Sequence, residues 1–249
     1  NQTADKIIYP LVCDEADAKA QLGEYGACVK IAMIMAMITQ AFRFAYEPIV
    51  FASARDRDSK EHYAKGMKFF IIFTLLAFLS VMAYLHILQH IIGPEYRDGL
   101  RTVPIVMAAE IMMGVYFNLS FWYKLIDKTI WGAWFSIAGC IVLLTVNIVF
   151  IPKYGYMACA WGGFAGYATA MTLSYIVGQR KNPIHYPMGS ICVYVAITAL
   201  FFAVIQWSNA HLPTVAALAL NTVVLLMFVG HILYHDLPLD GILRRLRRG

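Results

Sequence analysis

The sequence is poor in charge. Lysine, arginine, aspartate and glutamate make up only 14% of the 249 residues, whereas about 25% is usual for a soluble globular domain. Hydrophobic residues make up 60% of the chain, and its mean hydropathy is +0.62. The net charge of +5 is modest, and most basic residues fall between apolar runs, which argues against a nucleic-acid surface. This composition excludes an ordinary soluble domain and favours a membrane protein.

The sequence also lacks the patterns of common enzymes. It contains no Gly-x-Ser-x-Gly elbow, no His-Glu-x-x-His zinc pattern and no phosphate loop. None of the five cysteines forms a Cys-x-x-Cys pair, so we expect them to act as small hydrophobic side chains. We therefore expect no catalytic residue, no metal and no cofactor, and leave open a coupling ion, H⁺ or Na⁺.

What fills the chain is a series of apolar stretches of about twenty residues, the length that spans a bilayer. Turn signals such as Gly93-Pro94 and Pro152-Lys153 separate them. The sequence predicts an all-α, polytopic membrane bundle with about seven spans: Leu22–Phe51, Phe69–His90, Thr102–Tyr123, Trp131–Ile151, Met157–Gly178, Met188–Trp207 and Leu212–Leu233. Asp14–Gln21 is polar and is predicted to be an extracytoplasmic loop that follows the end of a truncated helix.

The basic residues between spans are unequally divided. The positive-inside rule places the richer side, and with it the C-terminus and the basic tail 234–249, in the cytoplasm of a multi-pass membrane protein. That side carries Arg55, Arg57, Lys60, Lys65, Lys68, Lys124, Lys128, Arg180, Lys181, Arg244, Arg245, Arg247 and Arg248, and the other side carries Lys6, Lys19, Arg97, Arg101 and Lys153.

Ionisable residues inside the first span are candidates for a transport pathway, because charge at membrane depth usually faces a wet cavity or a partner. The span contains Lys30, Gln40, Arg43 and Glu47. Arg43 and Glu47 are four residues apart, on one helix face, and are expected to pair. One interpretation is a polar stripe that binds an anionic headgroup, because the planar guanidinium group of arginine can donate two parallel hydrogen bonds to a phosphate. The other is that Lys30 snorkels outward and that Arg43 and Glu47 form a structural pair.

The third span places an acid near its centre. Glu110 is followed on the same helix face by Gly114 and Asn118. This arrangement predicts either ion coupling or a cavity wall, and the alternative is a protonated glutamate bonded to a neighbouring helix. In the fifth span, the spacing of Gly162, Gly166 and Ala170 predicts close helix packing.

Three segments together resemble a known family of transporters. They are Gln40-Ala-Phe-Arg43-Phe-Ala-Tyr-Glu47-Pro48, then Asn147-x-x-x-Ile151-Pro152-Lys-Tyr154-Gly155, and the acidic–basic pair Asp5-Lys6. They are similar to motifs of bacterial polysaccharide-unit flippases of the O-antigen and capsule type, the polysaccharide branch of the multidrug/oligosaccharidyl-lipid/polysaccharide exporter superfamily. The departures are Ile49-Val50 in place of aromatics, Ala158 in place of a glycine, and Lys6 in place of arginine.

The resemblance covers nearly the whole chain and implies the C-terminal half of a fourteen-helix, two-lobe, alternating-access transporter. By this mapping, residues 1–21 end a helix and form a loop, 22–178 form the C-terminal lobe, and 188–233 form two additional spans. The implied activity is the flipping of undecaprenyl-pyrophosphate-linked oligosaccharide across the membrane. Lys30, Gln40, Arg43 and Glu47 would contact the cargo, and Glu110, Asn118, Asp5 and Lys6 would line the cavity or couple an ion.

Other functions remain open on the sequence. A multidrug antiporter of the same superfamily would expel organic cations, although Lys30 and Arg43 favour an anionic cargo. A membrane glycosyltransferase or polymer ligase would need a large catalytic loop, and no segment between predicted spans exceeds roughly 20 residues. A further possibility is an inactive half-transporter, because transport would require the missing N-terminal lobe. The expected partners are therefore that lobe and membrane lipid.

Overall fold

The computed structural model describes residues 9, 15–53 and 59–236. These residues form helices and contain no strand. The seven long helices are α2 (Glu15–Ala52), α3 (Ser59–Ala83), α5 (Val103–Leu119), α7 (Ile130–Tyr154), α8 (Tyr156–Lys181), α9 (Met188–His211) and α10 (Thr214–His235). Short segments join them: α4 (Leu85–Leu88), η1 (Gln89–Ile91), η2 (Pro94–Thr102) and α6 (Phe121–Leu125). The predicted all-α membrane bundle is therefore confirmed.

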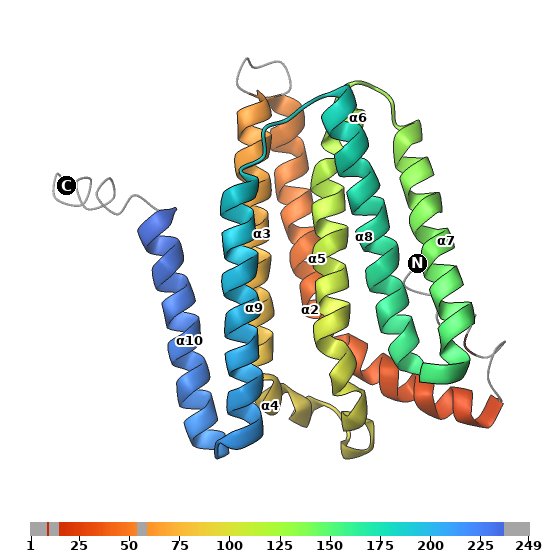
Figure 1. The fold of residues 1–249 in the computed structure, drawn as a ribbon, viewed down its shortest axis with the longest axis vertical. Coiled ribbons are helices and arrows are strands. Elements are labelled where there is room, and N and C mark those ends of the chain that lie inside the picture. Colours follow the sequence, from red (N-terminus) through yellow and green to blue (C-terminus); the bar gives the residue numbers. More distant parts are fainter. Residues whose placement is uncertain (1–8, 10–14, 54–58, 237–249) are drawn as a thin grey trace.

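The long helices run roughly antiparallel in chain order (Figure 1). α5 packs between α2 and α8, and α8 packs along α7. α3 contacts α2, α5, α9 and α10, so it joins the first helices to the last pair. Helices α2, α6, α8 and α10 all end at the same end of the bundle. We call it the basic end, because the described part of the chain places these basic residues there: Lys60, Lys65, Lys68, Lys124, Lys128, Arg180 and Lys181.

Six segments of the described part of the chain are long and apolar enough to cross a membrane, and α8 is the long helix there that is not among them. Its sequence is rich in glycine, alanine and tyrosine, which lowers its hydropathy. α8 lies between α5 and α7, so protein covers much of its surface. The predicted fifth span, Met157–Gly178, is therefore present as a helix, although its composition alone does not identify it as a membrane span.

The small residues of α8 let α7 approach closely, as predicted. A Cβ atom added at Gly166 would lie 2.8 Å from the carbonyl oxygen of Gly139, and one added at Gly139 would lie 2.6 Å from that of Gly166. The turn between the two helices depends on Gly155, which has φ +57° and so lies in a region that a side chain disfavours. Both features are consequences of glycine at these positions.

Several helix boundaries differ from the predicted ones. The part of the predicted loop that is described, Glu15–Gln21, belongs to α2. α3 begins ten residues before Phe69 and ends at Ala83, so the later part of the predicted second span lies in α4 and η1. The first turns of α3 contain lysine side chains, so hydropathy does not indicate where the helix begins. A helix that extends beyond the apolar core of the membrane can carry charge there.

The length of α2 is accommodated by a bend. Its first part lies across the end opposite the basic end, and the rest rises along α5 (Figure 1). The first part is held there because the Tyr156 hydroxyl donates a hydrogen bond to Glu24 (3.2 Å) and the Cys28 thiol donates one to the Tyr96 carbonyl (3.2 Å). A helix longer than the hydrocarbon core can tilt, protrude or kink, and α2 bends (Figure 1).

Polar contacts anchor the α9–α10 pair to α3. Asp236, at the end of α10, accepts hydrogen bonds from Lys68 of α3 and Tyr194 of α9. Burial alone would raise the pKa of Asp236, but the hydrogen bonds from Lys68 and Tyr194 outweigh it and hold this pKa below its ordinary value. At the other end of α10, the Asn221 amide donates to the Ala83 carbonyl (3.0 Å).

Candidate functional site

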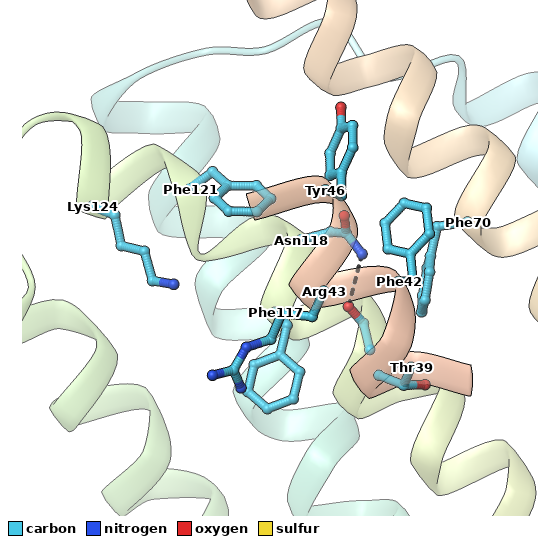
Figure 2. Close-up of a pocket in the computed structure, with 10 residues that line it drawn as sticks. Thr39, Phe42, Arg43, Tyr46, Phe70, Phe117, Asn118, Phe121 and Lys124 are labelled. Carbon is cyan, nitrogen blue, oxygen red and sulfur yellow. Dashed lines mark hydrogen bonds between the residues drawn. The ribbon is translucent and has the colours of Figure 1, made fainter. Parts of the chain in front are cut away.

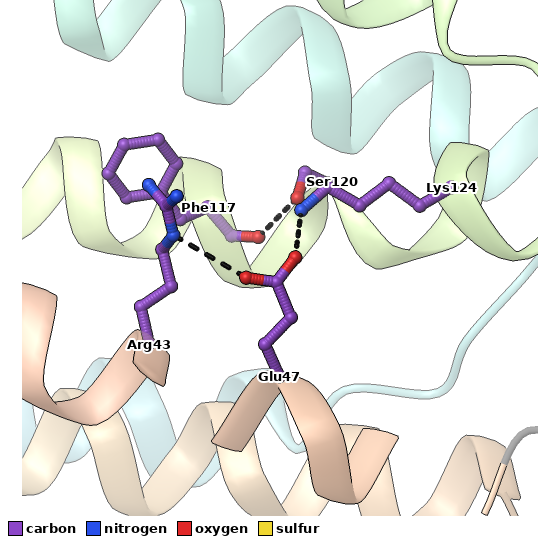
Figure 3. Close-up of polar contacts among 5 residues, drawn as sticks. All are labelled: Arg43, Glu47, Phe117, Ser120 and Lys124. Carbon is purple, nitrogen blue, oxygen red and sulfur yellow. Dashed lines mark hydrogen bonds and ion pairs between the residues drawn. The ribbon is translucent and has the colours of Figure 1, made fainter. Parts of the chain in front are cut away.

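Arg43 and Glu47 form the ion pair that their spacing predicts. Nε of Arg43 lies 3.5 Å from Oε2 of Glu47, one turn along α2 (Figure 3). Their side chains are 36% and 27% exposed, so the pair is neither fully buried nor fully solvated. Arg43 Nε makes no hydrogen bond in this arrangement, which leaves the contact as a loose electrostatic one.

A second cation, Lys124, reaches the same carboxylate from another helix. Nζ of Lys124 donates to Oε1 of Glu47 at 2.6 Å (Figure 3). Lys124 belongs to α6, which follows α5 after a break at Ser120. The Ser120 hydroxyl donates to the Phe117 carbonyl at 2.6 Å and supports this break. Glu47 therefore lies between two cations, one from α2 and one from α6.

Lys124 was absent from the residues that the sequence singled out. In the sequence it is one of the basic residues between predicted spans. The pair joins residues 77 positions apart, and no local spacing predicts such a contact. Lys124 lies near the end of an apolar run, and the facing part of α2 contains a single acid. These features are consistent with an ion pair between them, but they do not predict it.

The guanidinium group of Arg43 is held by aromatic rings. Its central carbon lies 4.9 Å from the centroid of the Phe117 ring and 5.9 Å from that of Phe44. Contacts of this kind orient a guanidinium group without using its N–H donors. Among the described residues, no hydrogen bond occupies the two terminal nitrogens of Arg43. With one acid and two cations, the cluster of Arg43, Glu47 and Lys124 carries a formal charge of +1.

A small cavity lies beside this cluster, between α2, α3 and α5 (Figure 2). Its volume is about 10 Å³, room for a single water molecule. Thr39 is 3% exposed and its hydroxyl has no hydrogen-bond partner there. The Asn118 amide donates to the Gly114 carbonyl at 3.0 Å. The cavity lining consists of Thr39, Phe42, Arg43, Tyr46, Phe70, Gly114, Phe117, Asn118, Phe121 and Lys124. A sugar does not fit there, so a large ligand would meet Arg43 from its exposed side.

The structure separates Lys30 from the cluster. Lys30 is exposed and lies thirteen residues before Arg43, which is about 20 Å along a helix and about 140° around its axis. It follows Cys28, whose thiol bonds to Tyr96 at the end opposite the basic end. One phosphate group cannot contact both Lys30 and Arg43 at this separation. Gln40 is half-buried, one turn before Arg43.

The remaining predicted residues lie elsewhere. Glu110 is 7% exposed and does not line the small cavity, although Asn118 on the same helix does. Asp5 and Lys6 lie outside the described residues. In the described part of the chain, no group of three or more His, Cys, Asp or Glu side chains is placed to hold a metal ion.

Comparison with protein-family models, with curated proteins and with solved structures gives no match for this chain.

Proposed function

We propose that this protein moves an anionic, polyprenyl-pyrophosphate-linked oligosaccharide across the membrane. The observation that carries the proposal is the cationic cluster within the membrane-spanning helices, in which no hydrogen bond to another described residue occupies the terminal nitrogens of Arg43. A guanidinium fork matches two phosphate oxygens through parallel hydrogen bonds. The motifs that resemble those of polysaccharide-unit flippases agree with this cargo.

The physical barrier to such transport is the charge and the hydration of the cargo. A charge at the bilayer centre costs several kcal/mol or more, and opposite charges lower that barrier. A cluster of charge +1 attracts a pyrophosphate, and Glu47 limits the attraction because it partly neutralises its two neighbours. Moderate attraction suits a carrier, which must release the cargo on the other side.

The cluster lies near the basic end. Glu47 is five residues from the end of α2, or about 8 Å, and Lys124 is one residue from the end of α6. In the proposed orientation this end faces the cytoplasm of a bacterial inner membrane, where the cargo is made. Arg43 and Lys124 would then be the first intramembrane cations that the headgroup meets, and rocking against a second lobe would carry it onward.

A multidrug antiporter is the competing function. An organic cation needs an uncompensated acid, and at this cluster Glu47 is outnumbered by Arg43 and Lys124. The charge of the cluster therefore favours an anionic cargo. A coupling ion, H⁺ or Na⁺, is compatible with either function, and Glu110, which is 7% exposed, is the candidate for it.

The test is substitution of Arg43 in the complete transporter, in cells whose surface polysaccharide depends on it. Arg43→Ala should reduce surface polysaccharide and leave lipid-linked units in the cytoplasmic leaflet. Arg43→Lys keeps the charge without the fork and should restore activity only partly. Lys128→Ala, which removes an exposed cation outside the cluster, is the matched control. Normal polysaccharide in Arg43→Ala cells at equal protein level would refute the proposal.

A further inference from the structure

A second cavity among the described residues is separate from the cationic cluster. It is a groove of about 500 Å³ between α3, α5, α8 and α9, within the size range of small-molecule sites. We call it the apolar groove. Its lining comprises Met67, Ile71, Leu75, Phe78, Ala108, Ile111, Met112, Val115, Leu119, Met171, Thr172, Tyr175, Tyr186, Met188, Ile191, Val195, Thr198, Ala199 and Phe202. None of these residues carries a charge, so the groove suits a hydrocarbon chain.

The length of the groove matches one leaflet of a bilayer. On α3 the lining extends from Met67 to Phe78, which is about 17 Å at the rise of an α-helix. On α9 it extends from Met188 to Phe202, or about 21 Å. The hydrocarbon core is ~30 Å thick, so one leaflet contributes about 15 Å. At the deep end, the rings of Phe78 and Phe202 meet, with their centroids 5.4 Å apart.

The other end of the groove opens toward the basic end and has a cationic rim. Lys60 lies seven residues before Met67, on the same face of α3. Its Nζ is held 3.1 Å from the carbonyl of Pro183, in the loop that leads to Tyr186 and Met188 of the groove. Lys60 forms no ion pair among the described residues, whereas nearby Glu61 is paired with Lys65. An anionic group at the mouth would therefore meet an ammonium group that no described acid neutralises.

We propose that the apolar groove binds one acyl chain of an anionic glycerophospholipid, whose phosphate lies at Lys60. The depth of one leaflet fits a chain anchored at the interface of the same leaflet, and a polyprenyl chain would extend far beyond the groove. The apolar lining binds the chain, and Lys60 selects the anionic headgroup. The site differs in place and chemistry from the cluster of Arg43, Glu47 and Lys124, and its test does not depend on transport.

The experiment places the protein in phosphatidylcholine vesicles that contain phosphatidylglycerol with a photoreactive acyl chain. After illumination, mass spectrometry of peptides locates the crosslinks. We expect crosslinks on groove residues such as Met112, Met171 and Met188. Photoreactive phosphatidylcholine at the same level should label these residues less. A fixed lysine near the surface contributes about 1 kcal/mol to binding an anionic lipid, so Lys60→Gln should lower phosphatidylglycerol labelling about fivefold. Lys128→Gln at the same end is the control.

A second pair of variants tests the groove itself. Ala199 lines it and is exposed, so Ala199→Trp fills the groove without entering the packed interior. Ala196, on the same helix, is also exposed but does not line the groove, and Ala196→Trp is the matched control. Labelling should be lost in the first variant and kept in the second. Three outcomes would overturn the proposal. They are labelling outside the groove, equal labelling by the two lipids, and displacement of the phospholipid from the groove by a photoreactive polyprenyl phosphate.

Discussion

The contact between Glu47 and Lys124 should contribute more to stability than the contact between Glu47 and Arg43. The first joins α2 to α6 at 2.6 Å, with side chains 27% and 30% exposed. The second is a 3.5 Å contact within α2. Helix pairs of the second kind contribute about 0.3–0.5 kcal/mol. A charged hydrogen bond between partly buried groups on different helices should contribute about 1–1.5 kcal/mol, near the upper range for contacts between membrane helices.

Double-mutant cycles measure these two energies. Glu47→Gln would be combined with Lys124→Met in one cycle and with Arg43→Met in the other, and unfolding would be followed by circular dichroism during titration with a denaturing detergent. The control cycle combines Glu61→Gln with Lys65→Met, because that pair is also 2.6 Å apart but its side chains are 61–63% exposed. It should yield no more than about 0.5 kcal/mol.

The control cycle separates distance from environment. If the Glu47–Lys124 coupling energy equals that of Glu61–Lys65, partial burial does not strengthen the contact and our reasoning fails. If the Arg43 coupling exceeds the Lys124 coupling, Glu47 primarily neutralises Arg43. The charge that we assign to the cargo site would then reside on Lys124.

Three further predictions concern packing, pH and orientation. Gly166→Ala should destabilise the bundle by about 1–3 kcal/mol, because its Cβ would press on the Gly139 carbonyl. Gly163→Ala should be neutral, since a Cβ there meets no atom within 4 Å. Unfolding in a denaturing detergent compares the stability of the two variants. The stability that the lowered pKa of Asp236 contributes should be present at neutral pH and lost as pH falls through that pKa, which lies below the ordinary aspartate value. The protection factors of the α10 amides should therefore fall in acid, and Asp236→Asn should lower them at neutral pH; equal protection of both proteins at neutral pH would contradict this. A reporter fused to the C-terminus should be active only on the cytoplasmic side, and activity outside would reverse the proposed orientation.

Local patterns predicted most of the fold. Apolar length located most of the long helices, since each of these is an independent run of hydrophobic residues, and α8 is the exception. The contacts of Arg43 with Glu47 and of Gly166 with α7 followed from spacings of four residues. Helix starts were less predictable, because α3 begins among lysines at Ser59 and α2 begins within a polar segment at Glu15. Such turns lie beyond the apolar core, where hydropathy carries no signal.

The composition of the candidate site was only partly predictable. Lys124 was missed because tertiary packing, and no local spacing, brings it to Glu47. Lys30 was grouped with Arg43 because both are cations in one apolar run. Helical geometry already places them about 140° apart around the axis. Charge in a span indicates that a partner is needed, but it does not identify the partner or the face.

The positions of the cations change how the proposed transport must work. Arg43 and Lys124 lie toward the basic end, whereas Lys30 follows the part of α2 that is fixed to the opposite end by Cys28. A single ring of cations around one headgroup is therefore excluded by distance. If Lys30 contributes, it contacts the cargo at another stage or contacts another part of it. The interval of about 20 Å between Lys30 and Arg43 is two thirds of the ~30 Å hydrocarbon core. A cargo that contacted Arg43 and then Lys30 would therefore remain near a positive charge while it crossed most of the hydrocarbon core.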